Sequence, residues 1–220
     1  MKKIKALVKL DFIFIKTTWI WLFAFLGISL IMGLINQIGI AFVVSLSLFI
    51  ATLCLIPFEL TDKSNLNILY GILPTNRKSM VTARFIFYFV FFLLVVVFGA
   101  VGMVLIDLLF NNVITFTNIL TTLALAFGIY FLFIGFISPF IYKYSYTKGK
   151  FFMWALIAVF LIILNIEPLL SIINIETNFN LFNVFFLNYT TASLITLGLG
   201  MLVMVISYFI SKKIYLNKNF

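Results

Sequence analysis

Long uncharged stretches dominate this sequence and restrict the folds that it can adopt. Of its 220 residues, 65% are hydrophobic and only 10% are charged. In soluble domains about a quarter of the residues are charged. A helix needs about 20 apolar residues to cross the hydrocarbon core of a bilayer. The chain is therefore predicted to be an all-α integral membrane protein.

Six apolar runs are long enough to span a membrane. They cover residues 17–35, 38–58, 85–106, 119–141, 151–173 and 190–211. The first run follows several lysines, as in a signal sequence, but it is too long and no small-residue cleavage site follows. We therefore expect it to remain as the first span. The six runs predict one transmembrane domain that occupies residues 1–220.

The basic residues divide the loops between the spans into two classes. All 15 lie in the N-terminal arm, the loops after the second and fourth spans, and the C-terminal tail: Lys2, Lys3, Lys5, Lys9, Lys16, Lys63, Arg77, Lys78, Arg84, Lys143, Lys148, Lys150, Lys212, Lys213 and Lys218. The alternate loops have none. Because positively charged loops stay in the cytoplasm, both termini and the loop at 59–84 are predicted to be cytoplasmic. The net charge of +9 then reflects topology and anionic lipid, not nucleic acid.

Residues 1–16 are predicted to form an amphipathic helix that lies in the membrane interface. Its lysines fall on one stripe, and an apolar stripe beside them is formed by Ile4, Val8, Phe12 and Ile15. Asp11 projects with the apolar residues. A carboxylate there either reaches water at the interface or pairs with a cation of a cytoplasmic loop, Arg84 or Lys63.

The loop at 59–84 has helical signals of its own. They are an N-cap at Ser64, an apolar edge at Leu66, Leu69 and Tyr70, a C-terminal Gly71 and a helix-ending Pro74. A second helix is predicted to run from Arg77 through Arg84 into the third span. An ordinary solvated loop with capped helices explains the same pattern. The charged residues near this side are predicted to form a network of Asp11, Glu59, Lys63, Arg77 and Arg84.

The opposite side offers few ionisable candidates. Asp107 ends the third span, where a solvated cap explains it. Glu167 and Pro168 interrupt the fifth run near its outer boundary and are candidates for an outer gate. The alternative for Glu167 is an interfacial carboxylate without a transport role. The segment at 168–189 is apolar but broken by Asn and Ser, which predicts a re-entrant or interface-lying pair of short helices.

Several kinds of chemistry are disfavoured by what the sequence lacks. There is no histidine, so imidazole metal sites and His-based acid–base pairs are excluded. The single Cys54 is predicted to be a small buried residue. No predicted span carries two carboxylates at i,i+3 or i,i+4, which disfavours an intramembrane protease. No Gly-x-x-x-x-Gly-Lys-Ser/Thr loop is present. The chain is therefore predicted to be no enzyme, with no catalytic, metal or cofactor-binding residue.

Two segments resemble small bacterial ABC exporter permeases of the second export type. One is LVKLDFIFIKTTW near the start, and the other is PFELTDKSNLNILYGILPTNRKSMVTARF. In that family an acidic residue ends the second span, and Leu-Pro-x-x-Arg-Lys and Val-x-Ala-Arg precede the third. Here these are Glu59, residues 73–78 and residues 81–84. The predicted topology of the whole chain, with six spans and both termini in the cytoplasm, also resembles that of this family.

The resemblance implies that the second cytoplasmic loop docks on a separate ABC ATPase. The docking residues would be Asn65, Leu66, Leu69, Tyr70 and Gly71, in a short coupling helix. It also implies two ATPase copies, which hold ATP and Mg²⁺, and a second permease copy in a homodimer. The short helices between spans five and six would be extracellular and cover the path. The expected location is the bacterial cell membrane.

The cargo is less closely specified. A path built from this sequence would be apolar and aromatic, which suits an amphipathic or hydrophobic cargo better than an ion or a sugar. Within the family, subunits that export phenol-soluble modulins and subunits that protect against antimicrobial peptides are similar to this chain. The resemblance thus implies export of peptides, with self-protection against such peptides as the alternative.

Overall fold

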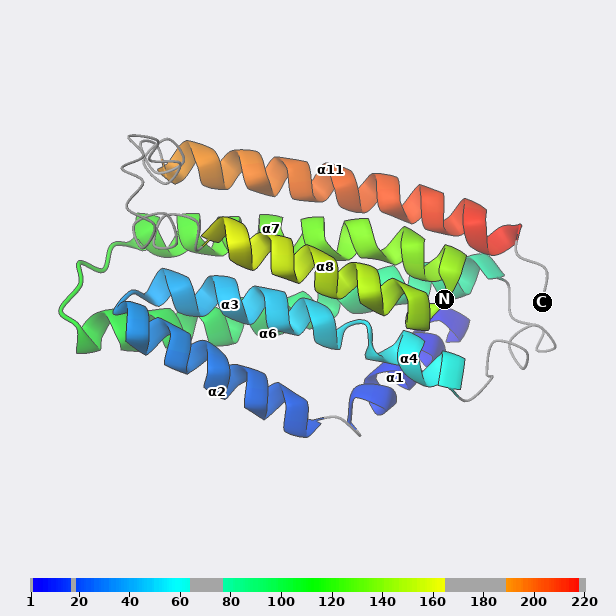
Figure 1. Ribbon diagram of the computed structural model, residues 1–220, viewed down its shortest axis with the longest axis horizontal. Helices are drawn as coiled ribbons and strands as arrows, with labels where there is room; N and C mark the ends of the chain where they lie inside the picture. The colour runs from blue at the N-terminus through cyan, green and yellow to red at the C-terminus, as the bar shows by residue number, and fades with distance from the viewer. Residues whose placement is uncertain (1, 17–18, 64–76, 165–188, 218–220) are drawn as a thin grey trace.

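The computed structural model describes residues 2–16, 19–63, 77–164 and 189–217 (Figure 1). Its helices are α1 (Lys2–Lys16), α2 (Trp19–Asn36), α3 (Gly39–Leu53), α4 (Ile56–Lys63), α6 (Arg77–Leu109), α7 (Phe116–Tyr144), α8 (Tyr146–Leu164) and α11 (Tyr189–Leu216). No strand occurs in these ranges. The all-α prediction is confirmed for the part of the chain that they cover.

Five stretches in the described ranges are long and apolar enough to cross a membrane. They are Trp19–Asn36, Gly39–Asp62, Lys78–Leu109, Phe116–Tyr144 and Tyr189–Leu216. Each corresponds to one of the six predicted spans. The fifth predicted span, 151–173, is described only as far as the end of α8, and the predicted short helices at 168–189 lie outside the described residues except for Tyr189.

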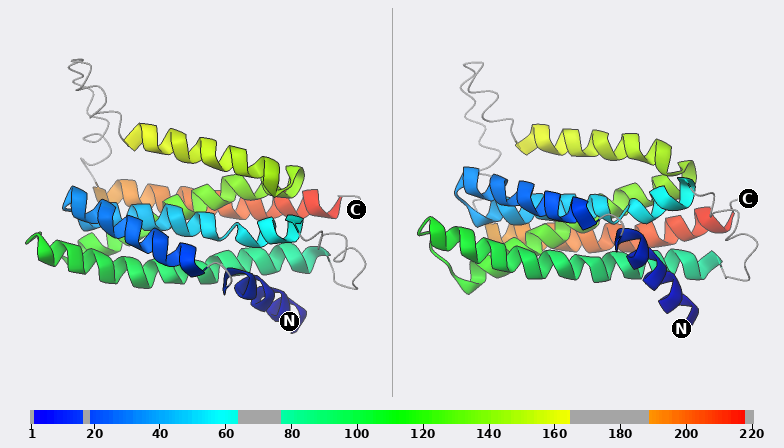
Figure 2. Two further views of the ribbon diagram at one scale, coloured as in Figure 1. Left: turned by 60° about the horizontal axis from the view of Figure 1, so that its bottom comes forward. Right: turned by 90° about the horizontal axis from the view of Figure 1, so that it is seen from below.

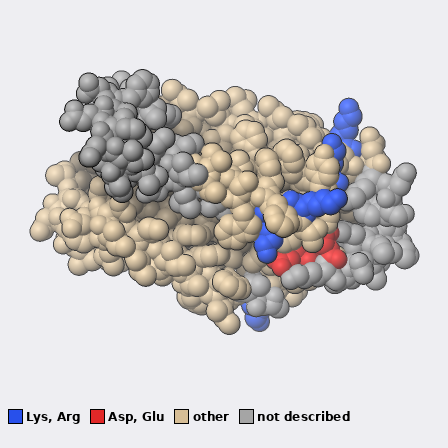
Figure 3. Space-filling model, viewed as in Figure 1, with Lys and Arg blue, Asp and Glu red and all other residues tan. Residues whose placement is uncertain are grey.

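The two ends of the bundle differ in charge. The start of α1, the end of α11, the start of α6 and the connection between α7 and α8 lie at one end (Figures 1 and 2). We call this the basic end, after Lys78, Lys143, Lys148 and Lys213. Charged side chains gather there on the face shown in Figure 3. The sequence predicts that these segments share the cytoplasmic side, and that orientation stays a prediction.

The second predicted span is not one uninterrupted helix. It was expected to run over 38–58, but the chain turns at Cys54 and Leu55 between α3 and α4. Pro57 explains the break, because it has no N–H to donate and its ring would clash with the carbonyl of Leu53. The residues after this turn form a separate short helix that leads toward residue 63.

The centre of the bundle is aromatic and almost without solvent access. Its largest fully buried side chains include Phe42, Phe87, Tyr88, Phe91, Tyr130 and Phe131. The rings of Phe92 and Phe127 meet edge to face at 4.4 Å, a favourable arrangement. Cys54 is fully buried, as predicted, and its sulfur lies 3.0 Å from the Tyr130 hydroxyl. That hydroxyl also donates to the carbonyl of Tyr88 at 2.8 Å.

Helices α7 and α11 approach each other through glycines. A Cβ at Gly128 would lie 2.4 Å from the carbonyl carbon of Thr196, and a Cβ at Gly200 would lie 2.7 Å from the carbonyl oxygen of Gly128. Such contacts are possible only without a side chain. In a membrane, small residues allow close backbone packing that a bulkier pair would prevent.

Asp107 was predicted to be a solvated cap, but it is buried. It is only 6% exposed, and its Oδ1 accepts the backbone N–H of Gly39 at 2.9 Å. The Asn112 side chain donates to the same oxygen at 3.2 Å and to the Gln37 carbonyl at 2.8 Å. Asp107 therefore satisfies an N–H at the start of α3 and joins the α2–α3 connection to α6. The sequence-based expectation was wrong because this partner lies 68 residues away.

Replacing Asp107 by leucine is expected to lower the free energy of unfolding by about 1–3 kcal/mol, because a buried backbone N–H loses its acceptor. Asp107→Asn keeps a carbonyl oxygen at the same place and should lose less. Thermal unfolding of the purified protein in detergent measures both changes. Equal midpoints for Asp107→Leu and the wild type would show that this contact does not hold the helices together.

Candidate functional site

Arg84 lies at the centre of a buried contact between three helices at the basic end. Its guanidinium is 3.8 Å from the ring centroid of Phe58, and Nη2 donates to the Pro57 carbonyl and the Thr61 hydroxyl, each at 3.4 Å. Its Nε lies 3.9 Å from Oδ1 of Asp11. Arg84 is 7% exposed. Through this one side chain, α6 is connected to α4 and to α1.

The face of α1 that meets the bundle carries Asp11. Asp11 is 4% exposed and Ile15 2%, whereas Lys5 and Lys9 are exposed on the other side of the helix. The structure thus places Asp11 against Arg84, one of its two predicted partners, and not in water. Burial raises the pKa of Asp11, and the nearby guanidinium opposes this by lowering it.

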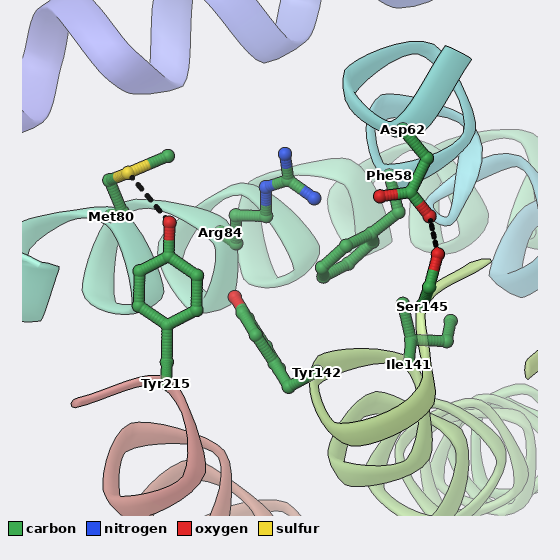
Figure 4. Close-up of a pocket in the computed structure, with 8 residues that line it drawn as sticks. All are labelled: Phe58, Asp62, Met80, Arg84, Ile141, Tyr142, Ser145 and Tyr215. Atoms are coloured by element: carbon green, nitrogen blue, oxygen red, sulfur yellow. Dashed lines mark hydrogen bonds between the residues drawn. The ribbon is translucent and has the colours of Figure 1, made fainter. Parts of the chain in front are cut away.

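A small pocket lies beside this ion pair. It is lined by Phe58, Asp62, Met80, Arg84, Ile141, Tyr142, Ser145 and Tyr215 (Figure 4). The Tyr215 hydroxyl donates to the Met80 sulfur at 3.3 Å, and the Tyr142 and Tyr215 rings meet edge to face at 5.5 Å. Residues of α4, α6, α7 and α11 therefore converge on one point at the basic end.

Asp62 connects α4 to the turn between α7 and α8. Its Oδ2 accepts the Ser145 hydroxyl and the backbone N–H of Tyr146, both at 2.5 Å. Tyr146 is the first residue of α8. The first N–H groups of a helix have no partner within the helix, and a carboxylate there is favoured by the helix dipole. Asp62 thus caps α8 from a neighbouring helix.

Comparison with known families decides what kind of protein this is. A family model described as "ABC-2 family transporter protein" matches residues 6–216. The chain belongs to this family. It is a transmembrane subunit of an ABC transporter, and membership implies that it works with an ABC ATPase at a membrane. Comparisons with curated proteins and with solved structures gave no significant match.

The permease helices flank the loop that was predicted to dock on the ATPase. Lys63 is the last residue of α4, and Arg77 is the first residue of α6. The loop between them, with the predicted docking residues Asn65, Leu66, Leu69, Tyr70 and Gly71, lies outside the described residues. The candidates for an outer gate, Glu167 and Pro168, also lie outside them. The helix predicted to begin near Arg77 and to enter the third span is present as α6.

Two contacts of the predicted charge network can be described, and the side chains of Lys63 and Arg77 lie outside the described part of the chain. Asp11 meets Arg84, whereas Glu59 lies near the phenol of Tyr146 on α8. Glu59 and Asp62 are spaced i,i+3 on α4, within the stretch Gly39–Asp62. The expectation that no span carries such a carboxylate pair was therefore wrong. Both carboxylates lie next to Tyr146, so their arrangement indicates attachment of α8 to α4.

Sequence reasoning missed Asp62, Thr61 and Ser145. The sequence did contain a hint of a role for Asp62. It follows Glu59 on the side predicted to be cytoplasmic, where Asp11 is the third acidic residue. Its partner was harder to find, since Ser145 is 83 residues away. A serine between two long apolar helices indicates a turn, but it does not say which helix supplies the acceptor.

Proposed function

We propose that this permease is the transmembrane subunit of an ATP-driven exporter that moves amphipathic or hydrophobic peptides out of a bacterial cell. Membership of the ABC-2 family supports the transporter subunit. The outward direction is proposed from the resemblance of the loop at 59–84 to that of exporter permeases. Two ATPase subunits and a second copy of this chain would complete the transporter, with ATP and Mg²⁺ bound by the ATPases.

The observation that supports the cargo class is the chemistry of the span surfaces. Apart from Asn36 at its end, the exposed large side chains of α2 are apolar or aromatic and include Trp21, Phe23, Ile28, Ile31 and Ile35. Five of the six predicted spans contain no charged residue, and the remaining one contains Glu167. A path between two copies would be lined by such surfaces, which offer an ion or a sugar few polar partners. Amphipathic peptides bury an apolar face and suit them better.

A transport assay tests this proposal. The permease is reconstituted in vesicles with its partner ABC ATPase, oriented with the ATPase outside, and given a dye-labelled amphipathic helical peptide of about 20 residues. We expect ATP-dependent accumulation of this peptide inside the vesicles and faster ATP hydrolysis. Maltose serves as the polar comparison. Stimulation by maltose and none by the peptide would contradict the proposed cargo class.

Two variants of the docking loop serve as controls in the same assay. Leu69→Asp and Tyr70→Asp place a charge in the predicted apolar edge, so both should release the ATPase during purification and abolish transport. Co-purification equal to that of the wild type would contradict the predicted docking residues. A self-protection subunit that only sequesters peptide is the second candidate function, and it would bind the probe without ATP-dependent movement.

A further inference from the structure

Helix α8 lies at the edge of the bundle and depends on few neighbours for its position. It packs against α7 and, at its start, against α4 (Figure 2). The rings of Phe140 and Phe152 stack at 4.2 Å across the α7–α8 pair. The chain reverses between these helices at Ser145, which has a φ of 76°. A residue other than glycine in this conformation needs neighbouring contacts to hold it there.

Contacts from α4 add to the backbone hydrogen bonds of Ser145 with Ile141 and Gly149. Asp62 accepts hydrogen bonds from both the Ser145 hydroxyl and the Tyr146 N–H, so it holds the turn and the start of α8 together. The carboxylate of Glu59, one turn earlier on α4, interacts with the phenol of Tyr146. Burial, with a smaller effect from the Glu59 carboxylate, raises the pKa of the Tyr146 phenol, which is therefore neutral and able to donate. The carboxylates of Glu59 and Asp62, one turn apart on α4, thus both contact Tyr146 of α8.

Helix α4 is also connected to α6 and is a separate helix from α3. The turn at Cys54 and Leu55 separates α4 from α3. Arg84 connects α4 to α6 through the Pro57 carbonyl and the Thr61 hydroxyl. Since α4 leads into the loop at 64–76 and α6 leads out of it, both stems of that loop are joined by Arg84. Asp62 extends the same connection to α8.

We propose that Asp62 is a positioning residue that couples the stems of the docking loop to α8, so that a movement imposed by the ATPase also displaces α8, with which the predicted fifth span begins. This inference rests on the proposed function, because it assumes an ATPase bound at the loop. It adds a second route for the movement, through α4 to α8, to the direct route from the loop into α6.

Thiol labelling measures this coupling without any cargo. In a Cys54→Ala background, Thr147→Cys reports on the start of α8 and Lys78→Cys on the start of α6; both native residues are exposed. Labelling rates are compared with and without ATP and vanadate in the complex with the ATPase. Couplings between protein sites typically change an equilibrium about 5-fold to 150-fold, so we expect ATP to change labelling at both positions by about fivefold or more.

In Asp62→Leu, the two reporter cysteines are expected to differ in how their labelling rates respond to ATP. Lys78→Cys should still respond to ATP, which shows that the complex is folded and the loop stem still moves, whereas the response of Thr147→Cys should be lost. Asp62→Asn retains an acceptor oxygen for the Tyr146 N–H and should keep most of the response. An unchanged response of Thr147→Cys in Asp62→Leu would overturn the proposal.

The same measurement separates this inference from the proposed function. If the wild-type complex shows the two responses but moves no peptide, the proposed cargo class fails and the coupling through Asp62 stands. If peptide moves normally and Thr147→Cys gives no response to ATP in the wild type, the exporter assignment stands and the coupling fails.

Discussion

Replacing Arg84 by methionine is expected to lower the free energy of unfolding by about 3–5 kcal/mol, because removing one partner leaves the other buried charge uncompensated. Asp11 is the group left behind, at 4% exposure. Burial already raises its pKa, and only the Arg84 guanidinium opposes that shift. The variant also loses the contact of the guanidinium with the Phe58 ring and its hydrogen bonds to α4. Chemical unfolding in detergent measures the loss.

A second variant tests whether the charge or the packing is responsible. Adding Asp11→Asn to Arg84→Met removes the carboxylate that has lost its partner, so the double variant should be more stable than Arg84→Met alone. Replacing a buried ion pair by neutral groups often costs little. Lys78→Met, at an exposed position of the same helix, should change stability by less than about 0.5 kcal/mol. Equal unfolding of the single and double variants would show that Asp11 carries no penalty.

The sequence predicted the helices of the permease better than it predicted the contacts between them. Apolar length fixes a span, because every backbone polar group in a bilayer must be satisfied within a helix or a closed barrel. The ends of α2 and α7 therefore fall within a few residues of their predicted positions, whereas α11 continues to Leu216, beyond the predicted end at 211. The break between α3 and α4 could have been predicted as well, since Pro57 is visible in the sequence and excludes an uninterrupted helix.

The polar contacts were predictable only in part. Asp11 stands on the apolar side of an amphipathic helix, so the sequence indicates that it needs a partner, and Arg84 was one of two candidates. The partners of Asp62 and Asp107 could not be predicted, because each carboxylate caps a helix that lies far away in the chain. Which helix start comes within reach of a carboxylate depends on how the spans pack, and apolar surfaces of similar composition leave that packing open.

The contact between α7 and α11 is a case where packing sets a strict steric limit. Gly128→Ala is expected to lower the free energy of unfolding by about 3 kcal/mol, at the upper end of the range for overpacked cores. The new Cβ would lie 2.4 Å from the carbonyl carbon and oxygen of Thr196 and 2.7 Å from the nitrogen of Leu197. All three are backbone atoms, so no side-chain rotation can relieve the clash and the two helices must separate. Unfolding of the purified variant measures the effect.

Gly198→Ala on α11 is the matched control, because nothing lies within 4 Å of its Cβ position. Alanine forms helices more readily than glycine, by about 1 kcal/mol, so this variant should be as stable as the wild type or slightly more stable. The contrast bears on the coupling proposed through Asp62. If α7 and α11 are held together by their glycines, movement at the basic end displaces α8 relative to a rigid pair. If Gly128→Ala is as stable as the wild type, α7 can shift relative to α11. A movement of α7 could then displace α8 without a connection to α4.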